Sequence, residues 1–491
     1  MQLYDKDLLS VQEVRELLDK AEAAQEELSQ WSQEQVDGLV KTIAKAGVRN
    51  ANRLAKMANE DTGFGNVEDK VIKNIFASQN VYEYIKDMKT IGEIGRDDEK
   101  KIRSVAVPVG VIAGLVPSTN PTSTVFYKAE IAIKAGNAIV FSPHPMALRC
   151  IRETVKVIRQ AIAEGGGNED LVSCITIPTM QATDNLMKHP KVAMILATGG
   201  SAMVRAAYSS GTPAIGVGPG NGPAYIEKTA DLPLAVKRIM DSKTFDNGTI
   251  CASEQSVVCD TDMAAQVQAE MEKQGAYFLS DEQRNKLGHF ILRANGTMNP
   301  LIVGKSAQAI AKLAEIDIPK DARVIVAKED GIGRGHPYSN EKLAPILAFY
   351  KRDDYKEICE LCQEILHYEG AGHTCSLHTK NDDIVTYFAM RVPASRIIVN
   401  TPSALGGIGA STGLMPSLTL GCGAVGGSAT SENVGPQHLM NVRHVAYGLK
   451  ELDDIKAAAF QTDEECCPAM NLSEGEVNEI VKAIVKRIQA V

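Results

Sequence analysis

Three things are scarce in this sequence: tryptophan, long apolar runs and an excess of basic residues. Trp31 is the only tryptophan among 491 residues. The longest apolar stretch, residues 105–117, contains two prolines and two glycines and is too short to cross a bilayer. Lys and Arg number 52 against 61 Asp and Glu, a formal net charge of −9, so the chain offers no basic stripe to neutralise phosphates. We therefore predict neither a membrane nor a nucleic-acid partner.

Signals for export and for metal binding are also missing. The N-terminus, MQLYDKDLLSVQEV, has no basic segment followed by an apolar one, so the sequence predicts no signal peptide and a cytoplasmic protein. The ten cysteines are then expected to be free thiols. Cys359 and Cys362 form a CELC pair in a helical pattern with no second pair, so we expect packing there and predict no metal site. Cys466 and Cys467 lie in a polar tail and remain unassigned.

The length of the chain indicates two or three domains, and the first part has helical patterns. Ser10 with Glu13 and Ser32 with Gln35 form capping-box patterns ahead of amphipathic runs. Residues 89–108 then have the pattern of a β-hairpin, KTIGEI and KIRSVAVP around the charged turn GRDDEK. Because an exposed hairpin can extend a neighbour's sheet, we predict an oligomerisation arm here.

From about residue 104 the pattern changes to strand, loop and helix in turn. Apolar runs that alternate with amphipathic helices indicate a parallel sheet covered on both faces, so the predicted class is α/β with a Rossmann-type nucleotide-binding architecture. A second series of the same kind follows. The expected strands are 105–115, 138–142, 172–177, 192–197 and 224–226 in the first series, and 256–258, 301–303, 324–327, 346–350 and 396–400 in the second.

The composition changes again after about residue 452. Residues 460–472 are polar and irregular, and Ser473 with Glu476 then caps a last helix. One face of that helix is apolar and indicates packing against another surface. The stripe consists of Val477, Ile480, Val481, Ile484, Val485 and Ile488.

Cys251 is the first candidate for chemistry. It lies in TFDNGTICASEQSVV, a loop of small residues where a substrate and several backbone N–H groups could approach a thiolate. An ordinary buried loop cysteine is the alternative, and the loop alone favours neither interpretation.

Four further places are hard to explain as scaffold. Asn120 follows an expected strand within PSTNP; its amide could donate to an oxyanion, or the motif could be a proline-bounded turn. Thr198–Ser201, TGGS, joins an expected strand to a helix, an arrangement typical of phosphate binding. Glu341 could be functional or a surface glutamate. His373, in the glycine-rich stretch GAGHT, could be functional or a structural loop histidine.

Taken together, these stretches resemble the aldehyde dehydrogenase family, and within it the branch that releases acyl-CoA. The resemblance extends from about residue 10 to 450 and rests on VPSTNPTST, FSPHP, ATGG, YSSGTPAIGVGPGN, FDNGTICASEQSV, EGAGHT, LTLGCG and SENVGPQHL. It implies an aldehyde dehydrogenase-like fold in a homodimer or homotetramer. The implied layout is an NAD- and CoA-binding domain (1–228), a catalytic domain (229–425), an oligomerisation segment (426–452), and a linker with a C-terminal helix (453–491).

The resemblance also assigns roles to single residues. Cys251 matches the family's nucleophile, and Asn120 matches its oxyanion donor, with Thr119 as the alternative. His373 matches a histidine of the acylating branch that could assist the CoA thiol. Other positions match residues that contact the cofactor, and they leave NAD and NADP both open. They are Ser142, Pro143, His144, Thr198, Gly199, Gly200, Ser201, Gly216 and, at the nicotinamide ribose, Glu341.

Gly216 is where this sequence departs from the hydrolytic members of the family. They carry a glutamate there, in an ELGGK motif, that activates the deacylating water; here the stretch is IGVGPG. A thiol such as CoA is a better nucleophile than water and needs less activation. The resemblance therefore implies reversible oxidation of a short-chain aldehyde to acyl-CoA with NAD⁺, through a thioester on Cys251. A hydrolytic enzyme and a non-catalytic assembly protein are the alternatives.

Two segments bear on the substrate and on partners. Residues 403–416, SALGGIGASTGLMP, are expected to line the substrate funnel and contain no Arg or Lys, which favours acetaldehyde or propionaldehyde over an anionic aldehyde. The tail, 453–491, resembles the encapsulation peptides that carry such dehydrogenases into bacterial microcompartments. The alternative is a helix that packs on its own oligomer.

Overall fold

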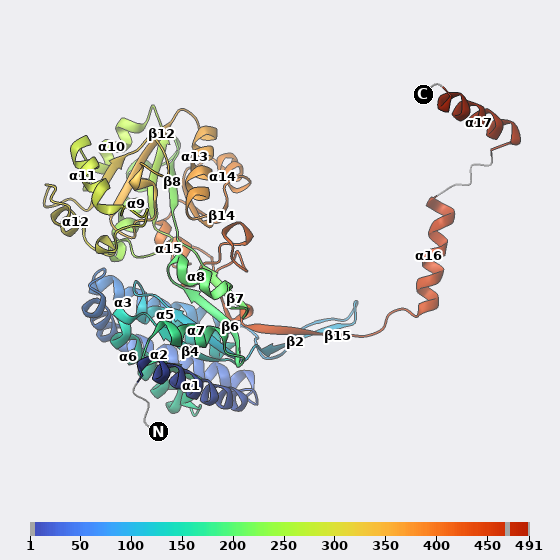
Figure 1. Cartoon of the computed structure of the whole chain (residues 1–491), viewed down its shortest axis with the longest axis horizontal. Coiled ribbons are helices and arrows are strands. Elements are labelled where there is room, and N and C mark those ends of the chain that lie inside the picture. Colours follow the sequence, from blue (N-terminus) through green and yellow to red (C-terminus); the bar gives the residue numbers. More distant parts are fainter. Residues whose placement is uncertain (1–4, 467–471, 490–491) are drawn as a thin grey trace. The chain divides into compact units, whose positions relative to one another are not determined.

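The computed structural model of this chain describes residues 5–466 and 472–489. They form two compact units, whose elements are labelled in Figure 1. The first unit contains the chain up to Gly92 together with Ala106–Asn441, and the second contains Glu93–Val105 and the described residues from Val442 onward. Every predicted site residue lies in the first unit. No described helix is both long and apolar enough to cross a membrane.

The chain begins with helices, as predicted. They are α1 (Lys6–Leu28), α2 (Gln33–Thr62), α3 (Val67–Ile75), the π-helical η1 (Phe76–Asn80) and α4 (Val81–Ile85). The capping box of Ser32 and Gln35 is confirmed. The cap expected at Ser10 is wrong, because Asp5 caps α1 by accepting from the N–H groups of Asp7 and Leu8. The helix therefore begins after Asp5, and Ser10 lies within it.

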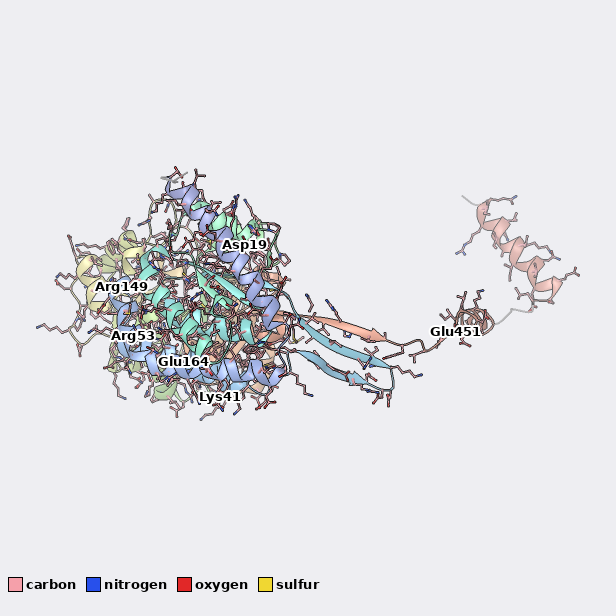
Figure 2. All side chains as sticks on the ribbon, turned by 90° about the horizontal axis from the view of Figure 1, so that it is seen from below. Asp19, Lys41, Arg53, Arg149, Glu164 and Glu451 are labelled. Atoms are coloured by element: carbon pink, nitrogen blue, oxygen red, sulfur yellow. The ribbon has the colours of Figure 1, made fainter. Side chains whose placement is uncertain are left out.

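Surface ion pairs join α2 to α6 (Leu148–Glu164), and their arginines, Arg53 and Arg149, are labelled in Figure 2. Arg53 Nη1 lies 2.8 Å from Glu153 Oε1, and Arg149 Nη2 lies 2.9 Å from Glu60 Oε2. Exposed pairs of this kind add little to stability. The contact between the helices therefore depends mainly on their buried apolar faces.

The first sheet is parallel, with strand order β5-β4-β3-β6-β7. The expected strand 105–115 is two strands, because Val109 and Gly110 separate β2 from β3. The short β7 was not expected. The strands are β3 (Val111–Val116), β4 (Ala138–Pro143), β5 (Val172–Cys174), β6 (Val192–Thr198) and β7 (Ala214–Val217); the helices are α5 (Pro121–Lys134), α6, α7 (Met180–Lys188) and α8 (Ser201–Tyr208).

The second sheet is also parallel, with order β10-β11-β12-β9-β8-β13-β14. Residues 224–226, expected in the first sheet, belong to β8 in this one. Residues 301–303 do not form the expected strand, because Pro300–Ile302 is a 3-10 turn. The strands are β8 (Gly222–Ile226), β9 (Glu254–Asp260), β10 (Ala276–Phe278), β11 (Val324–Lys328), β12 (Ile346–Arg352), β13 (Gly372–His378) and β14 (Ala394–Val399).

Helices cover the second sheet, as expected for parallel strands joined by crossovers. Their apolar faces pack against β8, β9, β11 and β12 in two core clusters. The helices are α9 (Leu232–Thr244), α10 (Ala264–Lys273), α11 (Asp281–Ile291), α12 (Ala307–Leu313), α13 (Tyr355–Tyr368), α14 (Asp382–Ala389) and α15 (Ser403–Gly407).

The second unit contains the predicted hairpin. β1 (Gly92–Asp97) and β2 (Ile102–Pro108) form a three-stranded sheet with β15 (Met440–Ala446). The expected irregular segment 460–472 is wrong over its first part, because α16 spans Leu452–Cys466. The cap of Ser473 and Glu476 is confirmed at the start of α17 (Glu474–Ile488). Cys467 lies outside the described residues.

Candidate active site

Cys251 lies in a turn between α9 and β9. The loop before it includes two residues in the left-handed region, Asp246 at φ 46° and Asn247 at φ 52°, which aspartate and asparagine tolerate best after glycine. Among the cysteines whose side chains are described, Cys251 is the one that is not buried, and all of these cysteines are free. Cys359 and Cys362 are buried in α13, as the packing interpretation predicted.

A buried charge network holds this loop against α3. Lys73 Nζ lies 2.5 Å from Asp246 Oδ2 and also donates to Thr249 Oγ1 at 3.0 Å. Lys70 Nζ donates to the same Asp246 oxygen at 3.0 Å. Burial lowers the pKa of Lys73 to about 8, although Asp246 opposes this shift. The sequence did not single out these residues, since one lysine on an amphipathic helix is usually a surface residue.

The same network orients Asn120. Lys73 Nζ donates to its Oδ1 at 2.7 Å, so the amide oxygen is occupied and the amide nitrogen faces the cysteine loop. That nitrogen donates to the carbonyl oxygen of Thr249, two residues before Cys251, at 3.1 Å. Its other contact, to Thr119 Oγ1, is longer at 3.3 Å. Asn120 is thus an amide with a defined donor end next to the predicted nucleophile.

His373 and Glu341 meet Cys251 around Gly220. A β-carbon on Gly220 would lie 1.9 Å from the carbonyl oxygen of Cys251 and 3.2 Å from His373 Cε1. The Gly220 N–H donates to Glu341 Oε1 at 2.8 Å. The structure therefore brings together three predicted residues that are far apart in the sequence.

His373 was expected in a loop. It lies instead near the start of the buried strand β13. Its Nδ1 contacts Thr374 Oγ1 at 2.9 Å, and its Nε2 has no hydrogen-bond partner among the described residues. Burial, with the charge of Arg396, holds the pKa of His373 well below its usual value. The ring is therefore neutral at physiological pH and has one nitrogen free for a proton.

The carboxyl group of Glu341 and the thiol of Cys251 are both protonated in this environment at neutral pH. Burial and the neighbouring Glu369 raise the pKa of Glu341 to about 8. Burial and Glu341 raise the pKa of Cys251 to about 12. The Cys251 thiolate therefore needs stabilisation from a positive charge or from bound molecules.

Six of the predicted cofactor residues line one cavity of about 240 Å³. It opens where β3, β4 and β6 end, the edge at which parallel sheets of this kind bind ligands. The six are Ser142, Pro143, His144, Thr198, Gly199 and Gly200. Ser201 begins α8, whose first N–H groups have no side-chain cap from Gly200. An uncapped helix start beside a cavity is suited to a phosphate group.

Gly216 does not line that cavity. A β-carbon there would lie 2.7 Å from Val204 Cγ1 and 2.9 Å from Tyr208 Cε2. The Tyr208 hydroxyl also bonds the N–H of Gly216 at 2.8 Å and its carbonyl oxygen at 3.1 Å. α8 thus fills the space that a glutamate side chain would need. The role of Gly216 in cofactor binding stays a prediction.

The predicted substrate segment, 403–416, contacts the cysteine loop directly. The Ser403 hydroxyl donates to the carbonyl oxygen of Ala252 at 2.7 Å, and its N–H donates to Glu254 Oε1 at 2.9 Å. Burial raises the pKa of Glu254 to about 7. Sequence reasoning missed Glu254, three residues from Cys251 within the same motif.

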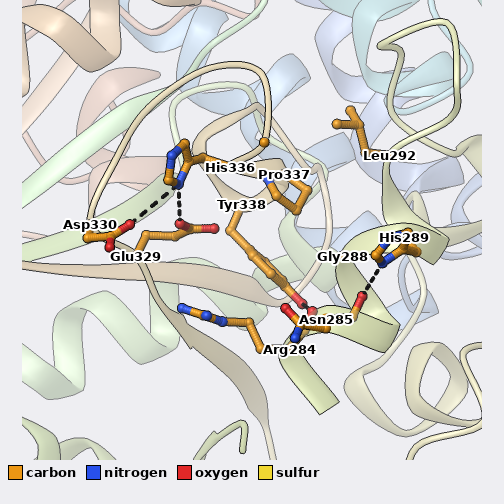
Figure 3. A pocket seen from close by; sticks show the side chains of 11 residues that line it. Arg284, Asn285, Gly288, His289, Leu292, Glu329, Asp330, His336, Pro337 and Tyr338 are labelled. Carbon is orange, nitrogen blue, oxygen red and sulfur yellow. Dashed lines mark hydrogen bonds and ion pairs between the residues drawn. The ribbon is translucent and has the colours of Figure 1, made fainter. Parts of the chain in front are cut away.

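A second cavity, of about 280 Å³, contains none of the predicted residues (Figure 3). On one side His336 Nδ1 lies 2.8 Å from Glu329 Oε2 and 3.6 Å from Asp330 Oδ1. On the other side lie Arg284 and His289 of α11. His336 thus contacts both acidic side chains of this cluster.

The parallel sheets, the half-buried Cys251 and the strand-end cavity agree with the nucleophile and cofactor sites that the sequence predicts. A sequence profile of the aldehyde dehydrogenase family matches residues 3–417, and the chain belongs to this family.

Individual relatives place it near members of the acylating branch. Over 442 residues it is 43% identical to the bifunctional aldehyde-alcohol dehydrogenase AdhE of Escherichia coli, an alignment that covers 89% of this chain and 50% of that protein. The chain thus spans about half the length of the first curated relatives that it matches.

Two solved structures share the fold. An acetylating aldehyde dehydrogenase from Geobacillus thermoglucosidasius is 50% identical, with a TM-score of 0.90 over 92% of this chain and 99% of that one. A propionaldehyde dehydrogenase from Rhodopseudomonas palustris, solved with bound CoA and an acylated cysteine, is 28% identical, with a TM-score of 0.80 over 88% and 97%. The resemblance predicted from the motifs is confirmed.

Proposed function

We propose that this chain oxidises a short-chain aldehyde to acyl-CoA with NAD⁺ and CoA, and that the reaction also runs in reverse. The observation that carries the proposal is the half-buried Cys251, which lies near His373 and Glu341 around Gly220, while position 216 has no room for a water-activating carboxylate. The acylated cysteine and CoA of the Rhodopseudomonas palustris structure support it.

In the first half-reaction the Cys251 thiolate adds to the aldehyde carbon, and the carbonyl oxygen becomes an oxyanion. The Asn120 amide and the Cys251 backbone N–H donate to that oxygen. Lys73 fixes the amide by its oxygen, so only the amide nitrogen of Asn120 can donate to the charge that forms. NAD⁺ held in the strand-end cavity would supply the hydride acceptor, and loss of that hydride would convert the adduct on Cys251 into an acyl thioester.

The chain's own residues fit a dinucleotide. Gly199 and Gly200 leave the start of α8 open to a pyrophosphate, with no atom within 4 Å of a β-carbon placed on Gly200. Ser142 and His144 lie in the same cavity, towards the adenosine ribose in our assignment. Glu341 would hold the nicotinamide ribose. No described Arg or Lys lines the cavity, which favours NAD over NADP.

In the second half-reaction His373 Nε2 takes the proton of the CoA thiol. The CoA sulfur then attacks the thioester carbon, the bond from that carbon to Cys251 breaks, and Cys251 leaves as a thiolate. His373 Nε2 has no hydrogen-bond partner among the described residues, so it is free to accept this proton. The net reaction is aldehyde, NAD⁺ and CoA to acyl-CoA, NADH and one proton.

The preferred substrate in this proposal is acetaldehyde or propionaldehyde. The segment 403–416 adjoins the cysteine loop through Ser403 and supplies no positive side chain for a distal carboxylate or sulfonate.

Assembly in this proposal uses the second unit. The β1–β2 hairpin with β15 serves as the arm of a homodimer or homotetramer, since its edge strands can extend a partner's sheet. α17, with an apolar stripe whose side chains are 44–71% exposed, serves as an encapsulation peptide for a bacterial microcompartment.

The test of the reaction is NADH formation from acetaldehyde with and without CoA, with the product identified by mass spectrometry. We expect turnover only with CoA, and acyl-CoA as the product. Cys251→Ala should remove both directions of turnover and leave NAD⁺ binding intact. Full turnover to the free acid without CoA would contradict the proposal.

A further inference from the structure

Arg396 carries a buried positive charge that no carboxylate neutralises within the described part of the chain. It lies on β14 and is 4% exposed. Its Nη2 donates to the carbonyl oxygen of His373 at 2.9 Å. Its other acceptors are neutral oxygens at 3.4 Å, on Thr374, Ser431 and Asn433. Buried charges are ordinarily paired, because removing a charge from water is costly.

Two thiols are the ionisable groups beside this guanidinium. The hydroxyl of Thr374 accepts from Arg396 Nε. This oxygen and Ala252, the residue after Cys251, both lie within 4 Å of a β-carbon placed on Gly407. Cys251 also packs against the apolar cluster that contains Cys422. Burial raises the pKa of both thiols, and Arg396 acts against that shift in each. The Cys422 thiol donates to the carbonyl oxygen of Leu420 at 3.5 Å, as a protonated sulfur does. The charge of Arg396 therefore remains unneutralised.

We propose that Arg396 is a positioning residue whose free charge stabilises the Cys251 thiolate, while Cys422 stays a neutral thiol beside it. The stabilisation acts twice in the reaction: before Cys251 attacks the aldehyde, and again when it leaves the thioester. This inference rests on the proposed function, in which Cys251 is anionic at both points.

The other groups that act on Cys251 do not supply this charge. Glu341 has the opposite sign when ionised, and its pKa of about 8 keeps it protonated at pH 7. His373 is held neutral by burial and by Arg396 itself. Cys422 is neutral. At neutral pH Arg396 thus acts on Cys251 without opposition from these neighbours.

Arg396 also has a structural part. Its acceptor Asn433 donates to the carbonyl oxygens of Gly407 at 3.0 Å and Met415 at 2.8 Å, both within the substrate segment. Removal of the side chain could therefore disturb packing as well as charge. The test has to separate these two effects.

The first experiment compares Arg396→Lys with Arg396→Gln in the full chain. The rate of alkylation of Cys251 by iodoacetamide is followed against pH by mass spectrometry of its peptide. The sulfur–carbon bond forms, iodide leaves and the thiol proton goes to buffer. We expect the Lys variant to stay within about threefold of wild type and the Gln variant to react about tenfold more slowly at pH 7.5, a pKa rise of about one unit.

Equal rates in the Lys and Gln variants would overturn the proposal. The assay needs no aldehyde, NAD⁺ or CoA, so it can succeed even if wild-type turnover proves to yield the free acid. In that case the acylation proposal fails and the role of Arg396 at Cys251 stands.

The second experiment tests the unneutralised charge and does not require a variant at Arg396. Cys422→Asp places a carboxylate beside the guanidinium, and Cys422→Asn is the uncharged control of the same shape. If the charge of Arg396 is unpaired, the Asp variant should have a higher Tm than the Asn variant at pH 7. This difference in Tm should disappear as the pH falls below the aspartate pKa. Equal Tm values would show that the charge is already compensated and would overturn the proposal.

Discussion

A β-carbon on Gly220 would lie 1.9 Å from the carbonyl oxygen of Cys251. The backbone next to the nucleophile is thus in direct contact with a glycine from a different segment. Gly220→Ala should push the cysteine loop away from Asn120 and lower kcat/KM about hundredfold, the usual cost of a misplacement of about 1 Å. Gly218→Ala is the matched control, because no atom lies within 4 Å of a β-carbon there. Equal losses in both variants would refute this account.

Asn120 and Thr119 give opposite predictions as oxyanion donors. The Asn120 amide faces the cysteine loop through Thr249, with its oxygen held by Lys73. Asn120→Ala should therefore lower kcat by about 10²–10³, as for other oxyanion donors, and Thr119→Ala by less than about threefold. Steady-state kinetics of NADH formation measure both. A larger loss in the Thr119 variant would move the donor to that residue.

Glu341 should make NAD⁺ binding depend on pH. Its pKa of about 8 means that the carboxylate forms only as the pH rises through that value. A carboxylate accepts ribose hydroxyls more strongly than a protonated carboxyl group. Calorimetric titration should show NAD⁺ binding about tenfold tighter at pH 9 than at pH 7. Glu341→Gln should bind NAD⁺ weakly and equally at both pH values. The same pH dependence in that variant would exclude Glu341 as the source of the effect.

The carboxyl group of Glu341 should also make folding stability depend on pH, in the opposite direction to NAD⁺ binding. The folded state keeps a proton that the unfolded chain releases above about pH 4.3. Its contribution to stability is therefore full below that pH and is lost as the pH rises through about 8. Urea unfolding should show that the free energy of unfolding falls more between pH 5 and pH 9 in wild type than in Glu341→Gln.

Gly216→Glu should fail to create a hydrolase. Val204 and Tyr208 of α8 occupy the space, so the larger side chain should destabilise the fold by about 1–3 kcal/mol and lower the Tm by at least about 4 °C. Gly38→Glu, at an exposed position of α2, is the control, with no atom within 4 Å of its β-carbon. CoA-independent acid formation by a stable Gly216→Glu variant would contradict this prediction.

Removal of residues 470–491 should leave soluble activity unchanged and abolish co-purification with microcompartment shell proteins. Within α17, Val481→Lys breaks the apolar stripe and Asn478→Lys does not, so only the first should act like the deletion. A change in the oligomeric mass of the deletion variant, with co-purification retained, would favour a helix that packs on its own oligomer.

Much of the fold follows from local patterns. Alternating apolar runs and amphipathic helices predicted two parallel α/β series, and the cap at Ser473 predicted α17. The misses have local causes. β7 is too short for a periodic signal, and a 3-10 turn at Pro300 replaced one expected strand. β13 was overlooked because GHTCSLH begins with glycine and carries two histidines.

The sequence by itself predicted Cys251 as the nucleophile and Thr198–Ser201 as the strand-end cofactor turn, because these motifs are contiguous and need particular backbone shapes. Tertiary structure alone decided which charges surround them. Lys73 lies on a helix and Arg396 on a strand, each in an ordinary local context, yet they contact Asn120 and His373, which lie far away in the sequence. A buried charge is defined by what it contacts after folding, and no local pattern records those contacts.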